Sequence, residues 1–151
     1  MSQSLTKLYT HIVFSTKNRV PFLADKMLRY QFHDYIGGVL RTLDTVPLVV
    51  GGVDDHIHIL CVTSKNNAIS KLVGETKRIS SMWIKSRDVI YSSFYWQRGY
   101  SAFSVGRTEI DKTRNYISSQ ETHHQNDSFE DEYLRLLDEN EMNYDLRYVW
   151  D

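Results

Sequence analysis

Two histidines, His56 and His58, are separated by one isoleucine in the apolar segment HIHILCV at residues 56–62. Asp54 and Asp55 precede this segment and are typical turn formers, so the pattern predicts a β-strand that follows a tight hairpin. Residues two apart in a strand point to the same face, which places both imidazoles side by side. Two imidazoles at this spacing form half of a metal site, or else two half-buried histidines that are hydrogen-bonded to their neighbours.

Several well-known histidine sites do not fit this sequence. A structural zinc site needs four ligands, usually including cysteines, but Cys61 is the only cysteine and would point to the opposite face of the strand. The zinc-protease motif H-E-x-x-H is absent. A histidine-triad hydrolase would need a third histidine where Leu60 stands, and metal-dependent amidohydrolases need a β/α barrel of about 250 residues. The remaining interpretation is an incomplete ligand set that another part of the chain completes.

The segment RNYISSQETHH at residues 114–124 offers the missing groups. Tyr116 and Gln120 are four residues apart and would share one face of a helix. A tyrosine phenol can act as a nucleophile that forms a covalent intermediate. The amide oxygen of a glutamine, combined with two imidazoles, makes a ligand set that suits Mg²⁺ or Mn²⁺. Taken alone, a tyrosine is usually a packed aromatic and a glutamine a solvated side chain, so the combination with the histidine pair carries the prediction.

The spacing of apolar residues predicts the elements that would position these groups. Strands are predicted at residues 8–15, 46–53, 56–62 and within the aromatic segment 94–105, and helices at 25–43, 67–87, 107–124 and 128–140. The resulting order β-α-β-β-α-β-α-α contains the ferredoxin-like split βαβ arrangement, an α+β fold with an antiparallel sheet. In this fold the first two helices cover one face of the sheet, which leaves the other face free for a site. The length fits a single domain over residues 1–151, with residues 125–151 forming a C-terminal helix and tail.

The charge is unevenly distributed along the chain. Residues 61–114 contain ten Lys or Arg and four Asp or Glu, whereas residues 115–151 contain two and ten. A basic middle of this kind can bind phosphates, although solvated surface residues would produce the same pattern. The chain contains a single cysteine, and no apolar run reaches the roughly 18 residues of a membrane span, so we expect a cytoplasmic protein without a membrane segment.

Three motifs occur together and in a specific order, namely GGVDDHIHIL at residues 51–60, WQRGYSAFSV at 96–105 and YISSQETHH at 116–124. With this set the chain resembles the small single-tyrosine transposases of the insertion sequence 200/605 family, which includes the repeat-associated tyrosine transposases. These enzymes are nucleases with a His-hydrophobic-His (HUH) motif. The resemblance covers almost the whole chain, from YTHIVFSTKNRVPFL at residues 9–23 to FEDEYLRLLDENEMNYDLRYVWD at residues 129–151.

The resemblance implies an enzyme that cleaves and rejoins single-stranded DNA. His56, His58 and Gln120 would bind the Mg²⁺ or Mn²⁺ ion, and Tyr116 would attack phosphorus to leave a 5′-phosphotyrosine link and a free 3′-hydroxyl. The resemblance also implies binding of imperfect DNA hairpins and a homodimer whose sheet is shared across the interface. In many family members the tyrosine helix reaches the partner's histidine pair, and Gly106 is a candidate hinge for such an exchange.

The basic residues of the middle segment are the candidates for contacts with DNA phosphates. They are Lys71, Lys77, Arg78, Lys85, Arg98 and Arg107. Two alternative functions remain open. One is a domesticated protein that binds hairpin DNA without transposition, and the other is a metal-dependent hydrolase of small phosphoesters, which would not need Tyr116. No role follows from the sequence for His123 and His124.

Overall fold

The computed structural model describes residues 2–151 and is built around a four-stranded antiparallel sheet with the strand order β2-β3-β1-β4. The strands are β1 (Tyr9–Ser15), β2 (Val46–Gly52), β3 (His56–Val62) and β4 (Ser101–Val105). Their order along the chain and across the sheet is that of the ferredoxin-like fold, so the predicted α+β fold class is confirmed.

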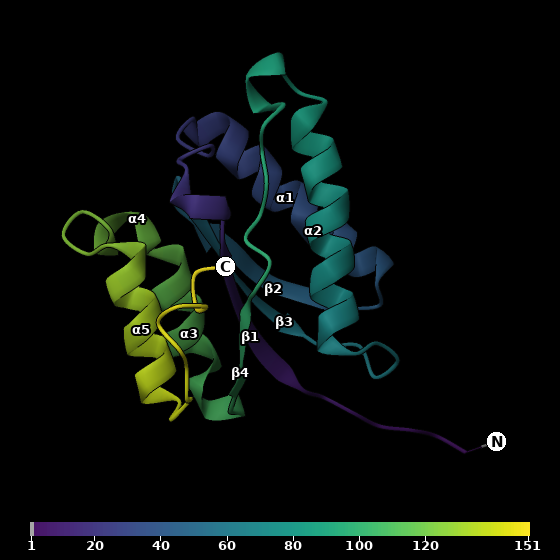
Figure 1. The fold of residues 1–151 in the computed structure, drawn as a ribbon. Coiled ribbons are helices and arrows are strands. Elements are labelled where there is room, and N and C mark those ends of the chain that lie inside the picture. Colours follow the sequence, from purple (N-terminus) through teal and green to yellow (C-terminus); the bar gives the residue numbers. More distant parts are fainter. Residues whose placement is uncertain (1) are drawn as a thin grey trace.

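Two long helices, α1 (Lys26–Thr42) and α2 (Ile69–Lys85), lie on one face of this sheet (Figure 1). Asp25 caps α1, because its side chain accepts a hydrogen bond from the backbone N–H of Leu28. The main hydrophobic core lies between these helices and the sheet, and it includes Ile57, Ile59 and Cys61 of β3. The alternating residues of β3, among them the two histidines, therefore point to the opposite face.

That opposite face is covered by the C-terminal part of the chain (Figure 1). Helices α3 (Ile110–Ser118), α4 (Gln120–His123) and α5 (Phe129–Glu139) lie there. A second, smaller core joins Val13 and Phe103 of the sheet to Phe129, Tyr133 and Leu137 of α5. The face that we expected to be free for a site does carry the histidine pair, but it is enclosed by these helices.

Short 3₁₀ turns at Lys17–Arg19, Val89–Tyr91 and Arg107–Glu109 complete the secondary structure of the described residues. The helix predicted over 107–124 is wrong as a continuous element, because it is divided into a 3₁₀ turn, α3 and α4. The break lies at Ser119, whose hydroxyl donates a hydrogen bond to the carbonyl oxygen of Asn115. Serine hydroxyls compete in this way with the regular helix pattern.

Helix α3 approaches β2 closely at Gly51. A Cβ atom at Gly51 would lie 2.8 Å from both the Cγ2 atom and the carbonyl oxygen of Ile117, which is too short for non-bonded atoms. Gly51 therefore allows the helix that carries Tyr116 to rest directly on the sheet of its own chain.

The segment WQRGY before β4 is fixed by α2. The Lys77 ammonium donates hydrogen bonds to the carbonyl oxygens of Gln97, Arg98 and Gly99, at 2.9, 3.1 and 2.6 Å. Burial lowers the pKa of Lys77 to about 8. No helix within residues 2–151 has the length and apolar content that crossing a bilayer would require.

Candidate active site

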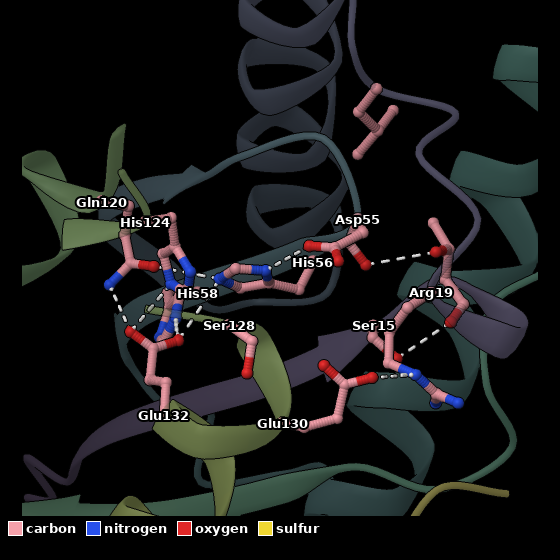
Figure 2. Close-up of polar contacts among 12 residues, drawn as sticks. Ser15, Arg19, Asp55, His56, His58, Gln120, His124, Ser128, Glu130 and Glu132 are labelled. Carbon is pink, nitrogen blue, oxygen red and sulfur yellow. Dashed lines mark hydrogen bonds and ion pairs between the residues drawn. The ribbon is translucent and has the colours of Figure 1, made fainter. Parts of the chain in front are cut away.

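The histidine pair lies on the enclosed face of β3, and both side chains are fully buried. Each ring uses its Nδ1 atom for a contact within the sheet layer. Nδ1 of His56 lies 2.7 Å from Oδ1 of Asp55, and Nδ1 of His58 lies 2.8 Å from Nε2 of His11 on β1. The two Nε2 atoms are therefore directed toward the helices that cover the sheet, as Figure 2 shows for the ring of His56.

Gln120 and Glu132 bring side-chain oxygens to these Nε2 atoms (Figure 2). Oε1 of Gln120 lies 3.0 Å from Nε2 of His56. Oε1 of Glu132 lies 2.9 Å from Nε2 of His58 and 3.3 Å from Nε2 of His56. Both side chains are about 1% exposed. Four potential ligand atoms from β3, α4 and α5 therefore meet at one buried point.

The spacing of these atoms fits a small divalent cation. Ligands about 2.1 Å from one ion and at right angles to each other lie about 3 Å apart, as in octahedral Mg²⁺ sites. The contacts of 2.9, 3.0 and 3.3 Å among the four atoms match this separation. His56, His58 and Glu132 also form a group of three whose ligand atoms all lie within 4.8 Å of one another. The donor set of imidazole nitrogens, a carboxylate and an amide oxygen suits Mg²⁺ or Mn²⁺.

Tyr116 lies beside this group and comes from the same chain. Its hydroxyl donates a hydrogen bond to Oε2 of Glu132, and the amide of Gln120 donates to the same oxygen at 2.9 Å. The ring centroid of Tyr116 is 5.7 Å from that of His58. The carboxylate of Glu132 thus lies between the phenol of Tyr116 and the histidine pair of the same chain.

The charges of the site are set by burial and by Glu132. Burial raises the pKa of a carboxyl group, but hydrogen bonds from His124, His56 and His58 outweigh it and hold the pKa of Glu132 well below its usual range. For His56, burial is outweighed by hydrogen bonds to Asp55 and Glu132, which raise the pKa to about 9. Burial lowers the pKa of His58. His56 and Glu132 therefore form a buried ion pair.

Burial and the negative charge of Glu132 raise the pKa of Tyr116, so its hydroxyl is neutral at neutral pH. Tyr116 also lines a cleft of about 350 Å³ between the sheet, α3 and α5. His11 and Phe103 form part of the same cleft. This cleft gives access to the Tyr116 side of a site whose candidate ligands are buried.

The structure brings together the four residues predicted for catalysis and metal binding, Tyr116, His56, His58 and Gln120. It does not bring the basic candidates to them. Lys71, Lys77, Arg78 and Lys85 belong to α2, on the other face of the sheet. Their assignment as DNA contacts stays a prediction, as does that of Arg98 and Arg107.

The surroundings of these basic residues differ. The ammonium of Lys77 is occupied by three backbone carbonyl groups. Arg78 forms an ion pair with Glu75 at 2.7 Å, and the ammonium of Lys85 lies 4.2 Å from the centroid of the Tyr95 ring. Arg98 and Arg107 are exposed, and Arg107 lines a groove at the end of the sheet. Lys77 and Arg78 are thus the members of the set whose hydrogen-bond donors already have partners within the protein.

Sequence reasoning missed Glu132, Asp55 as a partner of His56, and His11. For Glu132 a signal exists in the sequence. Phe129, Tyr133 and Leu137 recur at helical spacing and bury one face of α5, and Glu132 occupies that same face. A carboxylate in an apolar stripe is rarely buried without a partner, which makes it a candidate site residue. His124 also contacts the site, because its Nε2 atom lies 3.2 Å from Oε2 of Glu132.

Comparisons with known proteins give a family and two structural neighbours. The family model described as "Transposase IS200 like" matches residues 4–120. The match leaves α5 and the tail outside it, and the single domain over residues 1–151 stays a prediction. No curated protein matches the sequence.

Both structural neighbours share the fold. A crystal structure described as that of a transposase from Deinococcus radiodurans R1 has a TM-score of 0.61 and 19% sequence identity, and the similarity covers 80% of this chain and 98% of that chain. A REP-associated tyrosine transposase bound to a REP hairpin has a TM-score of 0.59 and 15% identity, covering 82% of this chain and 74% of that chain.

Proposed function

The chain belongs to the family of IS200-like transposases, and from this premise we propose that it is a metal-dependent enzyme that cleaves and rejoins single-stranded DNA through Tyr116. One observation carries the proposal. The carboxylate of Glu132 contacts the hydroxyl of Tyr116, the amide of Gln120 and both histidines. A nucleophile and the ligands for a cation therefore surround the same point.

In this proposal His56, His58 and Gln120 hold Mg²⁺ or Mn²⁺, and Glu132 completes the ligand set in the DNA-free protein. When bound there, such an ion would supply Lewis-acid chemistry, that is, polarisation of a phosphoryl oxygen and compensation of negative charge in the transition state. The protein holds the imidazole ring of His56 in place through Asp55, and it excludes water from the buried ligands.

The covalent step belongs to Tyr116. Its hydroxyl oxygen attacks the scissile phosphorus, a phosphorus–oxygen bond forms, and the bond between phosphorus and the 3′-oxygen breaks. The phenol proton ends on the released 3′-oxygen, so the products are a 5′-phosphotyrosine and a free 3′-hydroxyl. Because the step conserves a phosphodiester bond, the 3′-hydroxyl of another strand can reverse it and join new ends without a nucleoside triphosphate.

The phosphate needs the same hydrogen-bond donors that Glu132 uses in the DNA-free protein. Both groups are anions, and the carboxylate already contacts the hydroxyl of Tyr116 and the amide of Gln120. We therefore propose that the scissile phosphate takes the place of the carboxylate when α5 moves away from the sheet. The near-complete burial of the candidate ligands supports this exchange, since DNA cannot contact them while α5 is in place.

The proposed substrate is a single strand that contains a hairpin. One of the structural neighbours is described as bound to a REP hairpin, and the chain has exposed basic residues for phosphate contacts. Because the nucleophile and the candidate ligands come from one chain, we propose that the site acts in cis. A homodimer and a cytoplasmic location remain predictions from the sequence.

A covalent-adduct assay tests this function. The protein is mixed with labelled single-stranded DNA that carries the hairpin and flank of its own locus, with Mn²⁺ or Mg²⁺, and run on a denaturing gel. We expect a labelled protein band that disappears with Tyr116→Phe and with a chelator. Tight hairpin binding without a band would instead indicate a non-catalytic binding protein. Phosphoester turnover that Tyr116→Phe leaves intact would indicate a metal-dependent phosphoesterase.

A further inference from the structure

His11 is a buried histidine on β1 to which neither the family resemblance nor the catalytic step assigns a role. Its side chain is 5% exposed, and its Nε2 atom lies 2.8 Å from Nδ1 of His58. The two rings stack with centroids 5.1 Å apart and planes inclined by 27°. A polar contact this short between two buried rings constrains how each of them carries its proton.

The position of His11 is fixed by the sheet. β1 pairs with β3 in an antiparallel register that places His11 opposite Leu60 and Val13 opposite His58. The ring of His11 also contacts Phe103 of β4, with centroids 5.9 Å apart. His11 can therefore hold the ring of His58 against rotation, because its own ring has little freedom to move.

The two histidines of the pair have different partners at Nδ1. His56 faces the carboxylate of Asp55, a common partner for a metal-binding histidine. His58 faces an imidazole instead. With its Nε2 atom 2.8 Å from Nδ1 of His58, His11 can supply either a donor or an acceptor nitrogen to this contact.

A neutral imidazole that binds a cation through one nitrogen carries its proton on the other. For His58 the nitrogen that faces Glu132 is Nε2, so the proton belongs on Nδ1, where Nε2 of His11 can accept it. The geometry points to His11 as a positioning residue that accepts the Nδ1 proton of His58 and thereby keeps Nε2 of His58 available and correctly aimed for the divalent cation. This inference rests on the metal site of the proposed function.

Metal affinity in the absence of DNA tests the inference. Binding of Mn²⁺ is measured by electron paramagnetic resonance for the wild type, His11→Leu, His11→Gln and the control Thr10→Val. Thr10 is a buried polar residue on the same strand, and it contacts Thr63 rather than the histidines. Glutamine retains an acceptor oxygen near the position of Nε2, whereas leucine retains none.

We expect His11→Leu to weaken Mn²⁺ binding by about 10- to 100-fold, which is typical for loss of a partner behind a ligand. His11→Gln should retain most of the affinity and Thr10→Val all of it. Wild-type affinity in His11→Leu, or equal losses in the leucine and glutamine variants, would overturn the inference. Since no DNA is present, failure of the nuclease activity would not affect this result.

A second measurement needs no variant and so holds even if His11→Leu does not fold. In ¹⁵N-labelled wild-type protein saturated with Mg²⁺, a proton shared between the two rings produces a nitrogen–nitrogen coupling across the hydrogen bond. We expect this coupling between Nδ1 of His58 and Nε2 of His11, with the proton assigned to His58. A proton on Nε2 of His58 in the Mg²⁺-bound protein would refute the proposed role.

Discussion

Glu132 is the residue around which the candidate site is organised. Its two oxygens have different partners, since Oε1 faces the histidine pair and Oε2 faces Tyr116, Gln120 and His124. One anion thus contacts five polar groups at once. Under the proposed function, a DNA phosphate that enters the site would have to replace this anion.

Removal of this carboxylate should have opposite effects on two measurements. We expect Glu132→Ala to weaken Mn²⁺ binding without DNA, because one candidate ligand is lost. At saturating Mn²⁺ the same variant should form the covalent DNA adduct faster, because no carboxylate competes with the phosphate. The exposed Glu141→Ala is the control and should change neither quantity. A slower adduct reaction at saturating Mn²⁺ would show that Glu132 assists the chemistry rather than competing with it.

The stability of the metal-free protein should depend on pH through the same ion pair. The pKa of His56 is raised from 6.5 to about 9, so its contribution is fully present below pH 6.5 and is lost as the pH rises through about 9. The pKa of Glu132 is lowered from 4.5, so its contribution is present above that pH and is lost as the pH falls. Thermal unfolding without metal should therefore show a Tm that falls between pH 6.5 and 9. Asp55→Asn should reduce this slope, and an unchanged Tm across this range would contradict the ion pair.

At the scale of elements, the contact between α3 and β2 determines where the nucleophile lies. The space for a side chain at Gly51 is already filled by Ile117, and part of the obstruction is backbone. A larger residue at this position has to push α3 outward, and with it Tyr116 one residue earlier in the helix.

We expect Gly51→Ala to reduce the yield of covalent adduct at least tenfold, since a displacement of about 1 Å at a reacting group can cost roughly 100-fold in rate. Binding of hairpin DNA in a gel-shift assay should change little. Gly38→Ala is the matched control, because a Cβ atom there meets nothing within 4 Å. Equal adduct yields for the two variants would show that α3 is not positioned by this contact.

Much of the fold could be predicted because the sequence patterns that indicate each strand and helix are local. The alternation of HIHILCV assigns the histidines to one face and Cys61 to the other, and the helical spacing of apolar residues locates α1 and α2 to within two residues. The break at Ser119 was not predicted, although residues 118–124 contain no apolar residue to continue the pattern and the serine hydroxyls there do not favour a regular helix.

The site could be predicted only in part. His56, His58, Tyr116 and Gln120 stand out by residue type and spacing, and the fold brings them together. The residues that contact them do not stand out in the sequence. Asp55 looks like an ordinary turn residue, and His11 looks like an ordinary half-buried strand residue. Glu132 lies 74 positions from His58, and only the packing of α5 on the sheet reveals the contact. Long-range contacts of this kind depend on how elements dock rather than on local pattern.

At the scale of the whole molecule, one chain supplies the complete constellation of candidate groups. This arrangement can be tested by mixing Tyr116→Phe with His58→Ala, each of which lacks a different half of the site. In a cis arrangement the mixture should form no covalent adduct, since every subunit contains a defective site. Adduct formation in the mixture, at a yield near one quarter to one half of the wild type, would demonstrate exchange of α3 between subunits.

The burial of the site should also determine how fast a bound metal ion exchanges with solvent. A cation held beneath α5, as proposed, would leave only as often as that helix detaches, so the rate of metal exchange would report the frequency of local opening rather than the affinity of the ligands. Addition of excess chelator to Mn²⁺-loaded protein should release the metal in a slow phase that does not depend on chelator concentration. Arg19→Ala, which removes the ion pair to Glu130 at the start of α5, should accelerate that phase. The rate of metal release would then measure how often α5 detaches from the sheet, and this measurement needs no DNA.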